Sequence, residues 1–206
     1  MACYRRTYLC VCEGQQEEMY LKHVAKLITD FPNRVIHFNT IVGNPDRMRK
    51  TLVDYDKVAL FDHDFNDVGF RQSIELCDRL DKTGRATRQR SRTYHAFSNL
   101  NFDLWLILHK EDFGRPISRN DAYQPEVRRI YGLGSTDDIK SKELIQAILR
   151  QIALNDIKNA IRRAERLRSQ KIVSDGVIIG STRCYPNPDL SIHAFMQAVL
   201  ADCGQF

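Results

Sequence analysis

The stretch Tyr8-Leu-Cys-Val-Cys12 is a short apolar run that stops at Glu13-Gly14. An apolar run of this length, without polar alternation, is typical of a strand that is buried on both faces of a sheet. The pattern then changes to a helical period over residues 17–31, with an apolar stripe made of Leu21, Val24, Leu27, Ile28 and Phe31. The sequence therefore predicts a buried strand that leads directly into an amphipathic helix.

The same alternation of strand and helix continues through the first half of the chain. Further strands are predicted at residues 35–42, 57–61 and 94–97. Asn44-Pro45 supplies a cap and a first-turn proline for a helix that reaches about Val53, and another helix begins at about Gly69. Helices that connect short apolar strands are the signature of a parallel sheet covered on both faces. The predicted fold class is therefore α/β.

From Asn120 onward the pattern is mainly helical. Two apolar stripes predict helices near residues 144–152 and 157–167, and a closing helix is predicted over residues 192–200. Val177-Ile-Ile179 is predicted to return as a strand. We therefore expect two parts, a core over residues 7–116 and a mainly helical extension over residues 117–206 that packs on it.

The composition describes an ordinary globular chain. Of 206 residues, 43% are hydrophobic and 28% are charged, and no run approaches eighteen consecutive apolar residues. These values argue against a disordered, collagenous or membrane-spanning chain. The apolar run near the N-terminus is too short for a signal peptide, and the six cysteines form no CxxC pair with zinc spacing. We expect a reduced protein that is cytoplasmic.

Basic residues outnumber acidic residues, 31 against 26, which favours polyanionic partners. One stretch without any acid contains Lys82, Arg85, Arg88, Arg90 and Arg92. Its loop-like composition fits a segment that lies along a nucleic-acid backbone, whereas such runs are also common on solvated faces. A second basic set, over residues 158–168, shares its helix with an apolar face. Aromatic residues are not interleaved with either set, so a stacking platform for single strands is not predicted.

Three acids follow predicted strands. Glu13 ends the first strand, and Asp62 and Asp64 end the third. In a parallel α/β sheet ligands bind outside the carboxyl ends of the strands, so these acids are expected at one edge. Carboxylate oxygens are the ligands that Mg²⁺ and Mn²⁺ prefer. An acid after a strand can instead lie in a solvated turn or cap a helix, but the combination of a lone Glu with Asp-x-Asp favours a metal site.

Four ordered motifs together resemble the Toprim (topoisomerase-primase) superfamily and, within it, the RloB-like proteins of bacterial defence loci. Cys10-Val-Cys-Glu-Gly14 is similar to the strand-Glu-Gly signature, and Phe61-Asp-His-Asp64 is similar to the aspartate pair. Gly43-Asn-Pro45 resembles the opening of a family helix. Residues 98–109 are similar to the Ser-Asn-Pro-x-Phe-Glu-Leu-Trp block, which ends in His. The resemblance covers residues 7–116 and implies a Toprim-like Rossmannoid sheet flanked by helices.

The chain departs from the family pattern at several positions. Glu17-Glu18 stands where the family has Thr-Glu, Leu100-Asn101 stands where it has Pro and Cys, and Asp103 replaces its Glu. An Asp keeps the charge of Glu but shortens its reach by one methylene. We still expect Asp103 to be a fourth acid of the site. Later in the chain, Asn187-Pro188 and Ile192-His193 are more loosely similar to family motifs.

The resemblance implies a catalytic site with a divalent metal. It implies that Asp62 and Asp64 bind Mg²⁺ or Mn²⁺, and that Glu13 is a metal ligand or the general acid/base. It also gives His109 a proton-transfer or phosphate-contact role, although the apolar neighbours of His109 fit a histidine buried in the core. Candidate nucleic-acid contacts are Asn44, which suits phosphate binding as well as helix capping, Lys82, Arg85, Arg88 and Arg115.

From this resemblance we expect a Mg²⁺-dependent nuclease that cleaves tRNA or DNA as the toxic effector of an antiphage abortive-infection system. Related effectors work with an ABC-type ATPase, and this sequence contains no GxxxxGK[ST] loop of its own. The alternative is a non-catalytic Toprim module that binds nucleic acid or a partner protein. A primase or topoisomerase is less favoured, because no tyrosine stands in the context of a transesterification nucleophile. The apolar stripes of the helical extension fit three alternatives: docking a partner, forming a homodimer, or completing the core.

Overall fold

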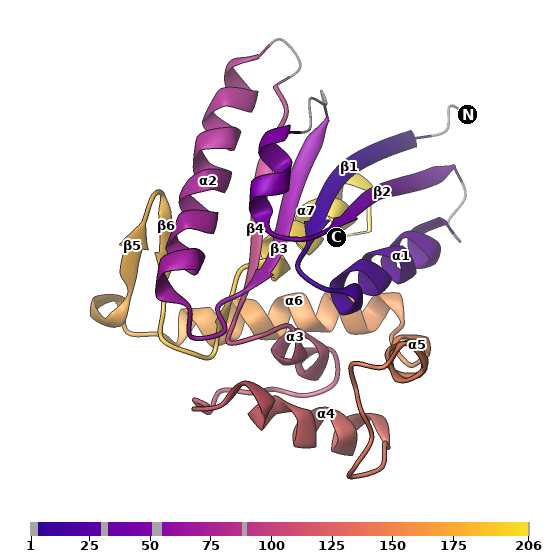
Figure 1. Cartoon of the computed structure of the whole chain (residues 1–206). Helices are drawn as coiled ribbons and strands as arrows, with labels where there is room; N and C mark the ends of the chain where they lie inside the picture. The colour runs from indigo at the N-terminus through magenta and orange to yellow at the C-terminus, as the bar shows by residue number, and fades with distance from the viewer. Residues whose placement is uncertain (1–3, 30–32, 51–54, 88–89, 206) are drawn as a thin grey trace.

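The computed structural model describes residues 4–29, 33–50, 55–87 and 90–205. Its centre is a five-stranded sheet in the order β2-β1-β3-β4-β7 (Figure 1). The first four of these strands are parallel, and β7 pairs antiparallel with β4. Their bounds are β1 (Tyr4–Cys12), β2 (Arg34–Val42), β3 (Asp56–Asp62), β4 (Thr93–Asn99) and β7 (Asp189–Leu190). The predicted α/β class with a mainly parallel sheet is confirmed.

Helices cover both faces of the sheet at β3 and at the end of β1, which explains why these strands are apolar on both sides, whereas the edge strand β2 is only partly covered. Successive side chains of a strand point to opposite faces. Cys10 and Cys12 accordingly belong to the core shared with α1 (Gln15–Thr29), whereas Val11 belongs to the core under α2 (Asp67–Ala86). A six-residue 3₁₀ helix, η1 (Pro45–Lys50), also packs on the α2 side.

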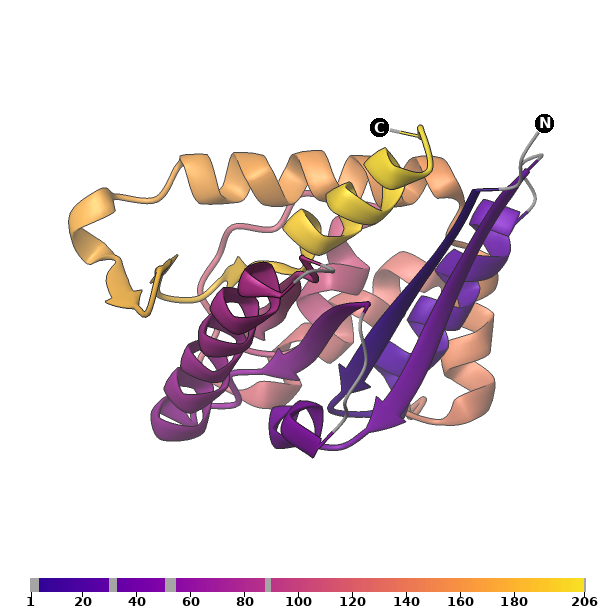
Figure 2. The ribbon, with the colours of Figure 1, turned by 90° about the horizontal axis from the view of Figure 1, so that it is seen from above.

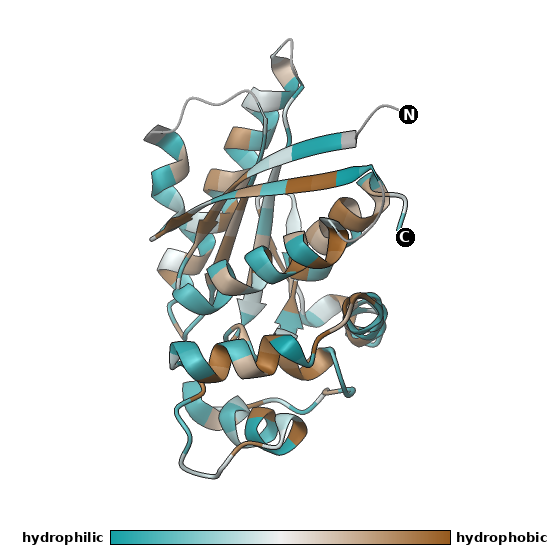
Figure 3. Cartoon of the chain, turned by 90° about the vertical axis from the view of Figure 1, so that its right-hand side faces the viewer, coloured by the Kyte–Doolittle hydropathy of each residue, from teal (hydrophilic) through white to brown (hydrophobic). Residues whose placement is uncertain are grey.

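The C-terminal half continues the larger of the two cores. In Figure 1, helices α3, α4 and α5 lie at the lower side of the sheet. Figure 2 shows α7 beside the long helix α6, and α7 also packs on β4. In Figure 3 the helices carry both hydrophobic and hydrophilic stretches, as expected for helices that cover a core on one side. The bounds are α3 (Asp103–Leu108), η2 (Asn120–Tyr123), α4 (Gln124–Tyr131), α5 (Lys142–Arg150), α6 (Leu154–Ser169) and α7 (Ile192–Asp202).

The strand predicted at residues 177–179 exists, but it does not join the central sheet. It is β5 (Val177–Ile179), which pairs only with β6 (Thr182–Cys184) and follows the short helix η3 (Val173–Asp175). The chain then returns to the sheet through β7, where Leu190 pairs with Ser98. The C-terminal part of the chain therefore contributes a strand to the sheet as well as helices around it.

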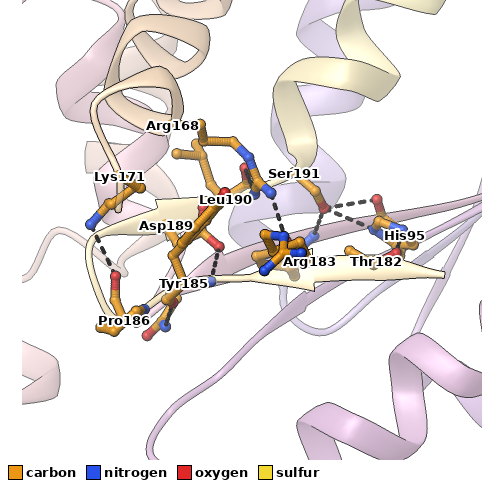
Figure 4. A network of polar contacts seen from close by, with 12 residues as sticks. His95, Arg168, Lys171, Thr182, Arg183, Tyr185, Pro186, Asp189, Leu190 and Ser191 are labelled. Carbon is orange, nitrogen blue, oxygen red and sulfur yellow. Dashed lines mark hydrogen bonds and ion pairs between the residues drawn. The ribbon is translucent and has the colours of Figure 1, made fainter. Parts of the chain in front are cut away.

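A buried polar network fixes this return of the chain (Figure 4). The guanidinium of Arg168 donates to Asp189 Oδ1 over 2.7 Å and to the carbonyl oxygen of Arg183 over 2.7 Å. The other carboxylate oxygen of Asp189 accepts the backbone N–H of Tyr185 over 2.9 Å. Burial raises the pKa of Asp189 to about 6, although Arg168 opposes that shift. The network joins α6, β6 and β7.

Two helix predictions differ from the structure. The helix expected from Asn44 to about Val53 is the short η1, and residues 51–54 lie outside the described residues. Lys82 and Arg85 lie on α2, which continues to Ala86, and not in a loop. The helix continues because Arg85 pairs with Asp81 one turn earlier, and because Gly84 leaves room for the close approach of the Ser91 backbone. Among the described residues, no helix is long and apolar enough to cross a membrane.

Candidate active site

Three acids meet at the carboxyl edge of two neighbouring parallel strands. Glu13 follows β1, and Asp62 is the last residue of β3, which pairs with β1. The backbone N–H of Asp62 donates to Glu13 Oε2 over 2.8 Å, which holds the glutamate against the end of β3. Asp64 lies in the turn that follows. The structure thus brings Glu13, Asp62 and Asp64 together.

The three acids stand between two cavities. The larger, of about 580 Å³, extends from them toward η1 and the first half of α2. The smaller, of about 290 Å³, extends toward the start of α1 and the segment before α5. Both cavities are lined by all three acids. The acids therefore form a wall common to two open spaces, which leaves room for a ligand on either side.

The three carboxyl groups favour protonation more than an ordinary carboxyl group does. Partial burial in the cleft raises the pKa of Glu13, and the charge of Asp64 raises it further, against the hydrogen bond from the Asp62 backbone. Burial also raises the pKa of Asp62, and Glu17, Asp64 and Glu13 add like-charge repulsion. The pKa of Asp64 is raised by burial as well. A cation placed among these groups would relieve both causes.

A fourth acid of the cleft, Glu17, was missed as a site residue in the sequence. Its side chain is 4% exposed, and its Oε2 accepts the backbone N–H of Gly14 over 3.1 Å. It lines the smaller cavity, and burial raises its pKa. The sequence did contain a signal for Glu17. It lies in the first turn of the helix that follows the first strand, and such a turn faces the edge of the sheet where ligands bind.

Lys140 supplies the positive charge of the smaller cavity. It stands just before α5, and its Nζ donates to Gln16 Oε1 over 3.2 Å. Although burial opposes the shift, the carboxylates of Asp103, Asp62, Glu17 and Asp64 raise the pKa of Lys140. No local sequence signal marks this lysine, because its neighbours in the site come from the other half of the chain.

Asp103 lies behind Lys140 and not in the cavities. Its side chain has no exposed surface, and neither carboxylate oxygen has a hydrogen-bond partner among the described residues. Burial raises the pKa of Asp103, whereas Lys140 and Gln16 favour its charged form. The acid expected as the fourth member of the site is therefore connected to it through Lys140.

His109 is part of the core. It is 1% exposed, its Nδ1 donates to the carbonyl oxygen of Trp105 over 2.7 Å, and its Nε2 accepts from the hydroxyl of Tyr20 over 3.1 Å. Burial lowers the pKa of His109 to about 3, so the ring is neutral near neutral pH. Both ring nitrogens are hydrogen-bonded, and His109 lines neither acid-lined cavity. It therefore fits the alternative given above, a histidine buried in the core.

The residues expected to contact nucleic acid are dispersed. Asn44 lines the larger cavity. Lys82 and Arg85 lie near the other end of α2, about 20 Å along the helix from the acids. Arg115 pairs with Glu126 and lies over the Phe113 ring, and Arg88 lies outside the described residues.

Two arginines of the larger cavity were not predicted. Arg49 lines it and pairs with Asp46 over 2.9 Å. Arg79 lines it too, and within the described part of the chain it forms no ion pair. Arg49 lies on η1, whose start flanks the acids. Arg79 lies about 18 Å along α2 from its start, so it places positive charge on the part of the cavity that is farther from the acids.

The acids suit a hydrated divalent cation better than a closed metal cage. Across residues 4–29, 33–50, 55–87 and 90–205, no group of three His, Cys, Asp or Glu side chains stands close enough to hold a metal ion. Mg²⁺ keeps several of its waters and takes only one or two carboxylates with substrate phosphates. Asp62 and Asp64, with Glu13 beside them, provide that donor set. The residues therefore fit Mg²⁺ or Mn²⁺.

Comparison with known proteins identifies the family of this chain. The model of the family described as RloB-like protein matches residues 8–191, which include the acids and the C-terminal return to the sheet. No curated protein and no solved structure matches the chain significantly. Because the match spans most of the chain, this protein belongs to the RloB-like family.

Proposed function

We propose that this protein is a nuclease that hydrolyses phosphodiester bonds with a divalent metal ion. The observation that carries the proposal is the meeting of Glu13, Asp62 and Asp64 at the carboxyl edge of adjacent parallel strands, between two open cavities. Burial raises the pKa of all three groups, and like-charge repulsion adds to it at Asp62 and Glu13, which favours binding of a cation at this edge.

The residues divide the chemistry among them. When bound, the metal ion would polarise a phosphate oxygen and lower the pKa of a bound water, and Asp62 and Asp64 would hold it. Glu13 is oriented by the Asp62 backbone, and its raised pKa suits a group that takes a proton from the attacking water. Lys140 offsets the charge of the carboxylates, so that a phosphodiester can approach them.

Asn44 and Arg49 line the larger cavity and suit the phosphates that flank the reacting one, whereas Arg79 suits a phosphate farther along the strand. The proposal includes the role that the family resemblance implies. The substrate is tRNA or DNA, the protein is a cytoplasmic toxic effector in antiphage defence, and an ABC-type ATPase controls it as a partner. The Toprim relationship belongs to the same proposal and rests on the sequence motifs quoted above.

The test is cleavage by the purified protein. Labelled total tRNA and plasmid DNA are incubated with Mg²⁺ or Mn²⁺, alone and with the partner ATPase, and Glu13→Gln and Asp62→Asn are compared with the unchanged protein. Glu165→Gln is the matched control, because Glu165 is an exposed acid on α6 that lines neither acid-lined cavity. We expect metal-dependent cleavage that both site variants lose and the control retains. Absence of cleavage under every condition would reject the nuclease.

One observation favours a second candidate, a module that binds nucleic acid or a protein without cleaving. The ammonium group of Lys140 already lies among the acids, where a metal ion would otherwise balance their charge. In that case the same incubation would show retarded migration of tRNA or DNA in a native gel with the polynucleotide intact. Chelation of metal ions would leave that binding unchanged.

A further inference from the structure

A third cavity, which we call the side groove, adjoins the acids. Its volume is about 420 Å³, within the range of about 300–1,000 Å³ typical of small-molecule sites. It lies between the turn after β3 and the segment that carries β5 and β6, which stands beside α2 in Figure 1. His63 and Phe70 line both the side groove and the larger acid-lined cavity. A ligand in the groove would therefore lie next to the acids.

The walls of the side groove are aromatic and apolar. Phe65 is 51% exposed and lines it directly after Asp64 in the chain. Tyr185 and Val177 line it from the C-terminal part, and Phe70 packs edge-on against His63 with ring centroids 4.7 Å apart. Aromatic residues that are distant in the sequence thus lie together in the groove. The sequence did not predict this, because its aromatic and basic residues are not interleaved. Every nucleobase has a face that can stack on such rings.

The backbone presents Phe65 to solvent in an unfavourable conformation. Asp64 and Phe65 have φ values of 45° and 57°, a region that residues with a Cβ rarely adopt. The turn is anchored, because the N–H of Asp64 donates to the carbonyl oxygen of Leu100 over 3.1 Å and the N–H of Asn66 donates to that of His63 over 2.7 Å. Strained conformations that the surrounding structure enforces are concentrated at functional sites.

The polar side chains of the groove have hydrogen-bonding capacity to spare. Asn99 Oδ1 and His63 Nδ1 are buried and have no partner among the described residues. The amide nitrogen of Asn99 is used, since it donates to the carbonyl oxygen of Tyr185 over 3.2 Å. Arg71 also lines the groove and forms no ion pair with a described residue, so its guanidinium is available to a phosphate. The ring faces suit the face of a base, the unpaired polar atoms suit its edge or the sugar, and the guanidinium suits the phosphate.

We propose that the side groove binds one unpaired nucleobase, stacked on Phe65, beside the phosphate that the acids act on. This inference rests on the proposed nuclease function and narrows its substrate to a single-stranded segment, such as a loop. A base stacked on Phe65 keeps its own phosphate close to Asp64, the preceding residue. A base in a continuous duplex is stacked on its neighbours and reaches the groove only after it is extruded, which costs free energy.

The experiment separates stacking from cleavage. In the Asp62→Asn background, which we expect not to cleave, a hairpin RNA with 2-aminopurine in its loop is titrated with the protein. Stacking of this base on an aromatic ring quenches its fluorescence. Phe65→Leu removes the ring but keeps an apolar side chain, and Phe65→Tyr keeps the ring. Val68→Ala is the control, because Val68 is 67% exposed at the start of α2 but does not line the groove.

We expect quenching with Phe65, with Phe65→Tyr and with Val68→Ala. Phe65→Leu should remove the quenching and weaken binding about 5- to 100-fold. A fully paired duplex should bind more weakly than the hairpin. Equal affinity and quenching for Phe65→Leu and Phe65→Tyr, or equal affinity for the duplex, would overturn the base site. Cleavage by the unchanged protein is measured separately. Quenching without cleavage would reject only the nuclease. Cleavage together with quenching that does not depend on Phe65 would reject only the base site.

Discussion

The ammonium nitrogen of Lys140 lies 3.7 Å from Oδ1 of Asp103, a carboxylate with no exposed surface. Lys140 comes from the segment between α4 and α5, and Asp103 begins α3 directly after β4. The helical part of the chain therefore supplies the counter-charge for an acid buried at the edge of the sheet. The C-terminal helices take part in the electrostatics of the site as well as in the core.

Lys140→Met should destabilise the protein by about 1–3 kcal/mol at neutral pH. Removing one partner of a buried pair costs about 3–5 kcal/mol, but Lys140 is 45% exposed, so solvent screens part of its interaction. Urea unfolding of Lys140→Met, Asp103→Asn and the double variant measures the coupling. We expect the double variant to recover much of the loss, because it contains no unpaired buried charge. Lys142→Met, an exposed neighbour, is the control, and simple additivity would contradict the pairing.

Asp62→Asn should remove the stabilisation that Mg²⁺ gives and yet raise the stability of the metal-free protein. Without metal, Asp62 is desolvated and repelled by Glu17, Asp64 and Glu13, so neutralising it should add about 0.5–2 kcal/mol. In the unchanged protein, Mg²⁺ at about 100 times its Kd should add about 2.7 kcal/mol. Thermal unfolding with and without Mg²⁺ measures both effects. An undiminished response of Asp62→Asn to Mg²⁺ would place the metal elsewhere.

The sequence predicted the parts of the fold that depend on local periodicity. The four parallel strands and the helices α5, α6 and α7 appear where their apolar patterns predicted them, because each buries a regular stripe or face. The two-residue strand β7 was not predictable. A strand so short has no period of its own, and its pairing is decided by the Arg168 and Asp189 network around it.

Only those residues of the candidate site that follow strands of the sheet were predictable from the sequence. Glu13, Asp62 and Asp64 follow strands, so the rule for parallel sheets places them at one edge. Lys140 reaches that edge from a distant loop, and Phe65 and Tyr185 line one groove from opposite ends of the chain. No short-range pattern records such contacts, because they arise only when the C-terminal helices pack.

The stability of the protein should fall as the pH is lowered below about 6.5, and His109 should be a main cause. Its pKa is lowered to about 3 in the folded chain, against about 6.5 when unfolded, so between these values only the unfolded chain takes up its proton. One such proton changes the unfolding free energy by about 1.4 kcal/mol per pH unit. His109→Gln should reduce that slope, measured by urea unfolding between pH 7 and pH 4.5.

The slope should not vanish in His109→Gln, because burial also lowers the pKa of His193 to about 4. His37, which is exposed on β2 and has no such burial, provides the control. His37→Gln should change the slope less than His109→Gln does. A slope that is the same in His109→Gln as in the unchanged protein would mean that His109 is protonated in the folded state.

Arg168→Met should destabilise the protein strongly, and more at pH 8 than at pH 5. At pH 8 the variant leaves the fully buried Asp189 charged without its partner, which costs about 3–5 kcal/mol. Asp189 already has a pKa of about 6 with Arg168 beside it, and removing the arginine raises that pKa further. At pH 5 the carboxyl group is then neutral and needs no counter-charge, so the loss shrinks. Urea unfolding at both pH values, with Arg162→Met on the exposed face of α6 as the control, measures the difference. Equal losses at pH 5 and pH 8 would instead show that Arg168 acts through its hydrogen bonds to the carbonyl oxygens of Leu190 and Arg183.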